Sequence, residues 1–404
     1  MTLRGLAASR VVTCDPTRPG PLGVVEDGAV VIDGERIAYV GVRAGAPRGI
    51  DFVDLGDRVL TPGLVDAHTH ACWIGSRHAE YALRMGGQDY RNVAGAGGGI
   101  LATQRVVAEA GVEDLERALS ARLRRMVSLG VTTVEVKSGY GLEGAAETRQ
   151  LEAIARAATD PAGPAVVPTL LALHAIPPSA RADRAGYVGR VARELVPEVA
   201  RRRLARFVDA YVDDGAFTVD EARLVGEVAR AAGLGLRLHV GQFADVGGAE
   251  LAASLGASSA DHLEHVSAAA IDALAGANVA AVLLPVASFT LGQNPPPVHA
   301  LRAAGVSLVV ASDSNPGTAP TESLPLAMAL AVRAYGLSPD EAWIAATRSA
   351  ARSLGLDDRG VLRDGARADL VAWNLPHEHA VVQPWGVSMT HTVVVCGRDR
   401  WPLG

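Results

Sequence analysis

The chain has 404 residues, more than one compact core usually accommodates, so we expect one large domain with a smaller one. Hydrophobic residues make up 49% of it, and the formal net charge of −6 comes without a long basic run. This composition indicates a buried globular core and argues against nucleic acid as a partner. The sequence shows no apolar run of membrane-span length and no signal-peptide pattern at its start, so we expect no membrane partner either.

Cysteine usage favours a cytoplasmic location. The three cysteines lie far apart and form no Cys-x-x-Cys motif; they are Cys14, Cys72 and Cys396. Such spacing fits a reducing compartment and argues against a disulfide framework.

Short strands are expected at both ends of the chain. Residues 29–33 and 36–41 flank Asp33-Gly34, which is a hairpin signal. Residues 360–373 and 391–396 show the same turn-and-strand pattern. We therefore expect residues 1–58 and 359–404 to form one small β-sandwich domain. Two unrelated terminal tails are the alternative.

The middle of the chain, residues 59–358, alternates apolar strand candidates with helical patterns. Such alternation implies a parallel sheet, and eight units imply a closed (β/α)8 barrel of the TIM type, so the fold class is α/β. The strand candidates are residues 63–68, 131–137, 165–174, 207–212, 236–240, 260–265, 279–284 and 307–313. The clearest helical patterns are residues 112–129, 145–158, 191–204 and 218–232.

Two further segments of this middle part stand out. Residues 71–103 are rich in glycine and are expected to form a long loop, which in a compact domain is usually functional or disordered. Ser338-Pro-Asp-Glu341 has the pattern of a capping box with proline at the first helical position, and it predicts a helix to about residue 354.

His68 and His70 follow the first barrel strand after a turn at Pro62-Gly63. Residues i and i+2 of a strand point to the same face, so both imidazoles can be aimed at one point. This is a metal-ligand geometry. A lone His-x-His is a weak signal, and it becomes informative only with the other strand ends.

Polar residues also stand at the ends of later strands, where the active site of such a barrel is formed. His174, His239 and Asp313 each end an apolar run, and a polar group there needs a partner. A hydrogen-bonded structural residue is the alternative at each position. Of two neighbouring histidines we favour His262 for the site, because the pleat turns His265 elsewhere.

Three histidines and one aspartate make a plausible open catalytic site for a divalent ion. Such an ion lowers the pKa of a bound water to about 7 and polarises a carbonyl. Asp313 is suited to take a proton from that water and return it to a leaving nitrogen. Zinc is the first choice by ligand type, and Fe²⁺ or Mn²⁺ remain open.

With these features the sequence resembles the amidohydrolase superfamily, and within it the imidazolonepropionase family. The resemblance spans nearly the whole chain. Its Lys-Ser-Gly-Tyr-Gly and Asp-x-Asn-Pro-Gly elements are far more specific than His-x-His. The motifs that carry it are Pro62-Gly-Leu-Val-Asp-Ala-His-Thr-His, Gly97-Gly-Gly-Ile, Glu135-Val-Lys-Ser-Gly-Tyr-Gly-Leu142, His174-Ala-Ile-Pro-Pro178, Ser259-Ala-Asp-His262 and Asp313-Ser-Asn-Pro-Gly-Thr318.

The resemblance implies a metal-dependent hydrolase that opens the ring of 4-imidazolone-5-propanoate to N-formimidoyl-L-glutamate in histidine degradation, with one Zn²⁺ or Fe²⁺ per subunit. Carried over by position, the metal ligands are His68, His70, His239 and Asp313. The implied substrate contacts are Arg77, Tyr90, Tyr140, His174, Gln242, Asn315, Gly317 and Thr318. The implied catalytic residues are Asp313, His262, His174 and Gln242.

For some of these residues the resemblance also implies a specific role. Arg77 and Tyr140 fall where the family holds carboxylates, which suits a guanidinium. His174 is expected to polarise the lactam carbonyl, and His262 to touch the metal-bound water or the reacting carbonyl. Homodimers are common in this superfamily, although no segment carries an interface signal.

One departure and one caution accompany the resemblance. The family pattern has a Glu three residues after the strand-5 histidine, and this chain has Gln242, which cannot act as a base. The base would then be Asp313 or His262. In binuclear relatives a barrel lysine is carboxylated and bridges two metals; Lys137 lies in a motif of the mononuclear family, so we expect one metal.

Two other functions are compatible with parts of this pattern. The first is another cyclic amidohydrolase or a deaminase acting on a small carboxylated heterocycle. The second is a catalytically inactive barrel that serves as a binding protein, which the intact ligand set argues against.

Overall fold

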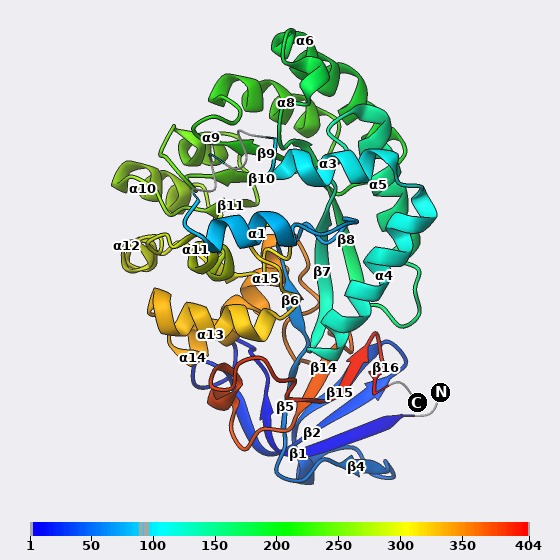
Figure 1. Ribbon diagram of the computed structural model, residues 1–404. Coiled ribbons are helices and arrows are strands. Elements are labelled where there is room, and N and C mark those ends of the chain that lie inside the picture. Colours follow the sequence, from blue (N-terminus) through cyan, green and yellow to red (C-terminus); the bar gives the residue numbers. More distant parts are fainter. Residues whose placement is uncertain (1–2, 89–91, 93–96, 403–404) are drawn as a thin grey trace.

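The computed structural model describes residues 3–88, 92 and 97–402. Strands from both ends of the chain form one mixed sheet at the base of the molecule (Figure 1). Its strands are β1 (Arg4–Val12), β2 (Val24–Asp33), β3 (Arg36–Val42), β4 (Phe52–Asp54), β5 (Val59–Pro62), β14 (Leu370–Trp373), β15 (Thr390–Val395) and β16 (Arg398–Trp401). The strand order is β16-β15-β14-β5-β1-β2-β3, with β4 beside β1.

This sheet joins the two ends as the sequence predicts. Asp33 lies opposite Arg36, so the hairpin at Asp33-Gly34 is confirmed. In place of the two separate layers of the expected β-sandwich, the strands of this domain form one continuous hydrogen-bonded sheet. It extends past residue 58, because β5 pairs in parallel with β1 and antiparallel with β14. The chain therefore enters the barrel only after Pro62.

The eight predicted barrel strands are present and parallel, in chain order (Figure 1). They are β6 (Leu64–Asp66), β7 (Val131–Lys137), β8 (Ala165–Leu173), β9 (Phe207–Val212), β10 (Gly235–Val240), β11 (Ser259–His262), β12 (Ala280–Leu283) and β13 (Leu308–Val310). The first and last strands meet through a parallel bridge between Thr69 and Ser314. Asp313 N donates to His68 O at 3.1 Å across the same seam.

Helices surround the barrel (Figure 1). They are α1 (His78–Met85), α3 (Ile100–Glu109), α4 (Val112–Ser128), α5 (Gly144–Ala157), α6 (Arg184–Arg190), α7 (Val196–Arg201), α8 (Val219–Ala231), α9 (Gly248–Ser254), α10 (Ala268–Gly276), α11 (Pro285–Leu291), α12 (Val298–Ala303), α13 (Leu324–Tyr335), α14 (Pro339–Ala345) and α15 (Arg348–Ser353). A π-helical turn, η3 (Val191–Leu195), joins α6 to α7, and short 3₁₀ turns occur at η1 (Arg43–Gly45), η2 (Pro178–Ala180) and η4 (Glu378–Val382).

Two local predictions need correction. The expected loop over residues 71–103 contains α1 and the start of α3. The capping box of Ser338 and Glu341 is confirmed, but the helix ends at Ala345 and a second one, α15, begins after Thr347. Thr347 has φ −131° and ψ −91°, outside the helical region, which accounts for the break.

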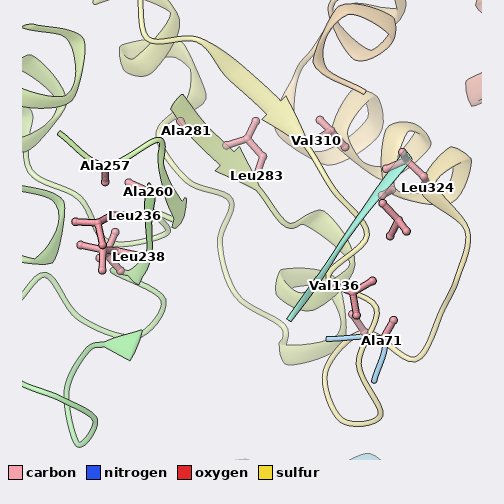
Figure 2. Close-up of a cluster of buried hydrophobic side chains, with 14 of the residues drawn as sticks. Ala71, Val136, Leu236, Leu238, Ala257, Ala260, Ala281, Leu283, Val310 and Leu324 are labelled. Carbon is pink, nitrogen blue, oxygen red and sulfur yellow. The ribbon is translucent and has the colours of Figure 1, made fainter. Parts of the chain in front are cut away.

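Alternation along the barrel strands separates the packing face from the interior. Leu236 and Leu238 of β10 pack outward into the hydrophobic core that contacts the helices (Figure 2). Arg237 and His239, between and after them, therefore point into the barrel. A second apolar cluster, with Val65, Val167, Phe207, Val282 and Val309, includes residues of five barrel strands. The polar site is built above these residues, at the ends of the strands.

Among the described residues, we find no helix with the length and apolar character needed to span a membrane.

Candidate metal centre and active site

A cavity of about 630 Å³ opens at the carboxyl ends of the barrel strands. It is the expected place for an active site in this fold. The predicted residues that line it are His70, Arg77, Tyr140, His174, His239, Gln242, His262, Asp313, Asn315 and Thr318. His68 lies beneath the cavity floor and is fully buried.

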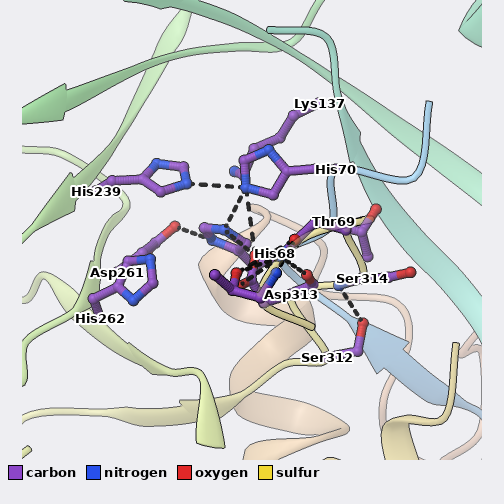
Figure 3. A network of polar contacts seen from close by, with 12 residues as sticks. His68, Thr69, His70, Lys137, His239, Asp261, His262, Ser312, Asp313 and Ser314 are labelled. Carbon is purple, nitrogen blue, oxygen red and sulfur yellow. Dashed lines mark hydrogen bonds and ion pairs between the residues drawn. The ribbon is translucent and has the colours of Figure 1, made fainter. Parts of the chain in front are cut away.

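Three imidazoles converge on one point below this cavity (Figure 3). The Nε2 atom of His70 lies 3.3 Å from Nε2 of His68 and 3.2 Å from Nε2 of His239. Asp313 joins them, with its Oδ1 3.5 Å from His68 Nε2 and 3.4 Å from His70 Nε2. The structure thus brings all four predicted ligands together from β6, β10 and β13.

Buried carboxylates hold two of these rings from behind. Asp261 Oδ2 lies 2.6 Å from Nδ1 of His68, and Asp209 Oδ1 lies 3.0 Å from Nδ1 of His239. A carboxylate accepts a hydrogen bond from Nδ1–H, so the proton stays on Nδ1 and the lone pair is on Nε2, where the rings meet.

Each of these carboxylates is in turn paired with a buried cation. The Nζ atom of Lys137 lies 2.9 Å from Asp209 Oδ2 and 2.9 Å from Glu135 Oε1. Arg237 lies 3.7 Å from Asp261 and donates at 2.9 Å to the carbonyl of Ala67, just before the first ligand. Each pairing offsets part of the free-energy cost of burying a carboxylate inside the barrel.

The donor set fits a divalent cation. Burial lowers the pKa of His68, His70 and His239 well below the ordinary value, so the rings are neutral as a metal requires. Asp313 Oδ1 is buried and has no hydrogen-bond partner among the described residues. Lone pairs and a carboxylate oxygen that face one another without donors need a positive charge between them.

Asp313 and His262 share an unusual backbone. Both follow the end of a strand or lie at it, and both have left-handed angles, with φ of 53° and 84°. Such angles are disfavoured for residues with a Cβ and are concentrated at functional sites. Burial raises the pKa of Asp313 to about 7. Burial alone would lower the pKa of His262, but neighbouring carboxylates, Glu264 first among them, outweigh it and raise that pKa.

Arg77 reaches the cavity from the start of α1 and is fixed there. It forms a two-pronged ion pair with Glu80, with one contact from Nε at 3.0 Å. Glu80 also accepts from Gly99 N at 2.9 Å, which ties the glycine-rich segment to this arginine. Gly317 lies directly against the guanidinium, because a Cβ at that position would be 2.0 Å from Arg77 Nη1.

His174 is held in one tautomer. Its Nδ1 lies 2.6 Å from the carbonyl oxygen of Gly139, and a carbonyl only accepts, so Nδ1 carries the proton. Burial lowers the pKa of His174 to about 4, so the ring is neutral and Nε2 is an acceptor. A neutral ring with its proton on Nδ1 presents an acceptor to the cavity, whereas the expected polarisation of the lactam carbonyl requires a donor at Nε2. Tyr140 stacks edge-on beside it, with ring centroids 5.4 Å apart.

The Asn315–Thr318 turn is bonded mainly to itself. Asn315 Nδ2 donates to Asp313 O at 2.7 Å and to Asp313 Oδ2 at 3.1 Å. Its Oδ1 accepts from Gly317 N at 2.8 Å and Thr318 N at 2.7 Å. The carbonyl of Gly317 accepts from Arg84 at 2.9 Å. The N–H and the carbonyl of Gly317, an expected substrate contact, are thus both hydrogen-bonded within the protein, and the turn holds Asp313 and Arg77 in place.

Gln242 lies in the cavity wall and is 7% exposed. Its Oε1 accepts from Tyr211 OH at 2.9 Å, which leaves the amide NH₂ group for the cavity. Its backbone N donates to Asp213 at 2.7 Å. Tyr90 lies outside the described residues. His265 is exposed, consistent with its exclusion from the predicted site.

The supporting residues Asp209, Arg237 and Lys137 were not predicted as part of the site. The available signal was a charged residue within an apolar strand, as in Phe-Val-Asp209-Ala-Tyr-Val and Leu-Arg237-Leu-His. Such residues are expensive to bury unless they are paired.

The chain is similar to known proteins in both sequence and fold. A family model described as the amidohydrolase family matches residues 59–401. The chain is similar to the imidazolonepropionase of Anaeromyxobacter sp. (strain K), with 43% identity over 401 residues that cover 96% of this chain and 93% of the relative. It is similar to the same enzyme of Caulobacter vibrioides (strain NA1000 / CB15N), with 43% identity over 390 residues, 96% and 97%.

Solved structures with similar folds include two zinc-bound proteins. An atrazine chlorohydrolase mutant from Arthrobacter aurescens TC1, complexed with zinc and atraton, superposes with a TM-score of 0.75 at 19% identity, covering 98% of this chain and 94% of that one. An adenosine deaminase from Xanthomonas campestris with bound zinc has a TM-score of 0.74 at 21% identity, covering 98% and 92%. At these identities the likeness establishes the fold alone.

Proposed function

Because the chain belongs to the amidohydrolase family and, within it, to the imidazolonepropionases, we propose that its cavity carries out the hydrolytic ring opening of 4-imidazolone-5-propanoate to N-formimidoyl-L-glutamate. The chain is a hydrolase that acts on the carbon–nitrogen bond of a cyclic amide. One observation carries the assignment of this reaction to the cavity. A converging histidine cluster and a buried guanidinium line the same space, which suits a hydrolysable ring that bears a carboxylate.

His68, His70, His239 and Asp313 would hold one divalent cation, Zn²⁺ or Fe²⁺. When bound, the cation supplies Lewis acidity that activates water and polarises the amide carbonyl. A single ion is favoured because Lys137 is already held by two carboxylates at 2.9 Å each, which leaves its Nζ unsuited to serve as a bridging group between two metals.

The substrate is oriented by groups on opposite sides of the cavity. Arg77, fixed by Glu80, binds the propionate carboxylate, and Tyr140 supports the same end. The Nε2 lone pair of His174 accepts a hydrogen bond from a ring N–H. Gln242 offers its amide NH₂ as a donor from the neighbouring wall.

Asp313 carries the proton in this scheme. The oxygen of the attacking water bonds to the lactam carbon, the ring carbon–nitrogen bond breaks, and the nitrogen needs a proton. Asp313 takes that proton from the water and delivers it to the nitrogen. His262 lines the same space, and because its Nδ1 faces Glu264, Nε2 is the nitrogen left to contact the water or the carbonyl oxygen. Gln242 has no acidic proton and stays outside the transfer.

The test is hydrolysis of freshly prepared 4-imidazolone-5-propanoate, followed by loss of its ultraviolet absorbance before and after chelation. We expect rapid loss that a chelator abolishes, with formimidoylglutamate as product. A metal-loaded, folded protein that leaves the substrate intact would overturn the assignment. Another cyclic amidohydrolase or a deaminase for a small carboxylated heterocycle would then be tested with a panel of such compounds.

We also propose that the enzyme acts in the cytoplasm on this small molecule, without a nucleic-acid or membrane partner. The net charge of −6 and the three unpaired cysteine thiols support this setting. A homodimer is compatible with the family, and light scattering of the purified protein decides it.

A further inference from the structure

Glu264 is a buried carboxylate to which the scheme above gives no role. It follows His262 by two residues, at the turn after β11, and its side chain is only 2% exposed. His262 and Leu263 both have left-handed backbones, with φ of 84° and 69°. Two consecutive residues with left-handed backbone angles are disfavoured. Here they reverse the direction of the chain, so that Glu264 lies beside the ring of His262.

The two side chains face each other through atoms that have no other partner. His262 Nδ1 lies 3.6 Å from Glu264 Oε2. Both atoms are buried, and neither has a hydrogen-bond partner among the described residues. A small rotation of either side chain brings the pair to hydrogen-bond distance and satisfies both atoms at once.

The other oxygen of Glu264 is held by a directional chain of hydroxyl groups. Tyr335, the last residue of α13, donates its hydroxyl to Ser288 Oγ at 2.6 Å. Ser288, on α11, donates its own hydroxyl to Glu264 Oε1. Because each hydroxyl has one proton, both hydrogen bonds run toward the carboxylate. Two helices thus fix Glu264 and leave Oε2 for the histidine.

We propose that Glu264 is the positioning residue for His262: its carboxylate accepts a hydrogen bond from Nδ1–H, which keeps the proton on Nδ1 and leaves Nε2 for the cavity. A neutral ring then accepts a hydrogen bond from the attacking water, and a protonated ring donates to the carbonyl oxygen. In both charge states Nδ1 stays bonded to Glu264, which is how the carboxylate of a catalytic triad orients its histidine.

The His262–Glu264 pair is relevant to the one position at which the sequence departs from the family pattern, Gln242. The chain has Gln242 where the family pattern carries a Glu, so this position after β10 has an amide in place of a carboxylate. Glu264 brings one to the next strand end and acts through a ring that lines the same cavity. The inference rests on the proposed ring-opening reaction for its kinetic consequences, but not for the state of the imidazole.

A double-mutant cycle tests whether Glu264 acts through His262. We expect Glu264→Gln to lower kcat roughly 10- to 100-fold with KM within about 2-fold, which is less than the roughly 100- to 10,000-fold that a general acid–base group itself contributes, because Glu264 acts only through His262. In a His262→Ala background the same change should have no further effect on kcat. Glu378→Gln is the matched control, because Glu378 is as buried (3% exposed) but pairs with Arg10 outside the cavity. It should lower Tm and leave kcat unchanged.

The imidazole signals in ¹⁵N NMR give a readout that needs no turnover. We expect the His262 ring, assigned from the spectrum that His262→Ala loses, to carry its proton on Nδ1 in the wild type. In Glu264→Gln, the new amide donates to Nδ1 and moves the proton to Nε2. A wild-type protein that shows this tautomer but does not hydrolyse the substrate would contradict the proposed ring-opening reaction and still support the Glu264–His262 interaction.

Two results would overturn the pair itself. One is an unchanged tautomer in Glu264→Gln. The other is a Glu264→Gln change that lowers kcat by the same factor in the His262→Ala background as in the wild type. If Glu264→Gln does not fold, Ser288→Ala replaces it and removes one donor to the carboxylate. We then expect a several-fold fall in kcat that disappears when His262 is alanine, and a fall that persists would contradict the proposal.

Discussion

Replacing Gly317 by alanine should raise KM for the carboxylated substrate by displacing Arg77. The Cβ of the new residue would lie 2.0 Å from Nη1 and 2.5 Å from Cζ of Arg77, whereas ordinary contact begins at 3.4 Å, 1.4 Å farther out. The guanidinium is tied to Glu80 by two contacts, so it cannot move that far and keep its geometry. Gly317 has no left-handed φ, so alanine brings no backbone strain of its own.

The size of the effect follows from what the displaced guanidinium loses. Hydrogen bonds to a charged group contribute about 1.5–3 kcal/mol. Lost from both ground state and transition state, this corresponds to a KM about 10- to 150-fold higher with kcat nearly unchanged. Steady-state hydrolysis of 4-imidazolone-5-propanoate, with Tm measured in parallel, checks the prediction.

The control for this experiment is Gly276→Ala in α10. A Cβ there meets nothing within 4 Å, so KM should stay at the wild-type value. Arg77→Ala should raise KM at least as much as Gly317→Ala, and adding Gly317→Ala to it should change KM little. A Gly317→Ala enzyme with unchanged KM and Tm would show that Arg77 does not bind the carboxylate from its position in the structure.

Three other predictions address the metal centre and the thiols. Asp313→Asn should reduce turnover by a factor of roughly 100 or more, because it removes a ligand and the proton carrier together; near-normal kcat in metal-loaded protein would refute the scheme. Asp209→Asn should weaken metal affinity by roughly 10- to 100-fold, measured by competition with a chelating dye, since Nδ1 of His239 loses its carboxylate; unchanged affinity would contradict that role. Burial raises the pKa of Cys14 to about 11 and that of Cys72 to about 12, so at neutral pH both thiols are protonated and should resist a thiol reagent until the chain unfolds. Partly exposed Cys396 should react first, and equal rates for all three in the native state would refute this reading.

The sequence predicts the barrel well because its signals are local. Eight apolar runs alternate with helical patterns, and each run ends where a polar residue interrupts it, as at His239 and Asp313. These features depend on one strand at a time. The segment over residues 71–103 is harder to predict, because its abundant glycines indicate a loop although it contains the short helix α1. Arg77, just before this helix, and Arg84 within it make its packing contacts.

The supporting interactions could not be predicted in the same way. Which carboxylate stands behind which histidine depends on the register between neighbouring strands. The pairing of β9 with β10 sets Tyr211 opposite His239 and thereby places Asp209 beneath that ring. The tautomer of His174 depends on a carbonyl from another loop, that of Gly139. Such facts arise from tertiary contacts that no single stretch of sequence contains.

The seam at which the barrel closes has a consequence for how the enzyme is made. His68 and Asp313 are hydrogen-bonded neighbours there, although one follows the first barrel strand and the other the last. During synthesis from the N-terminus, the ligand set is incomplete until residue 313 has left the ribosome and the ring of strands has closed. An ion bound by all four ligands then favours the closed barrel over any open intermediate by mass action. With the proposed ligand set, metal loading would therefore be a late step in biogenesis, and a chain that ends before β13 should bind no ion at this site.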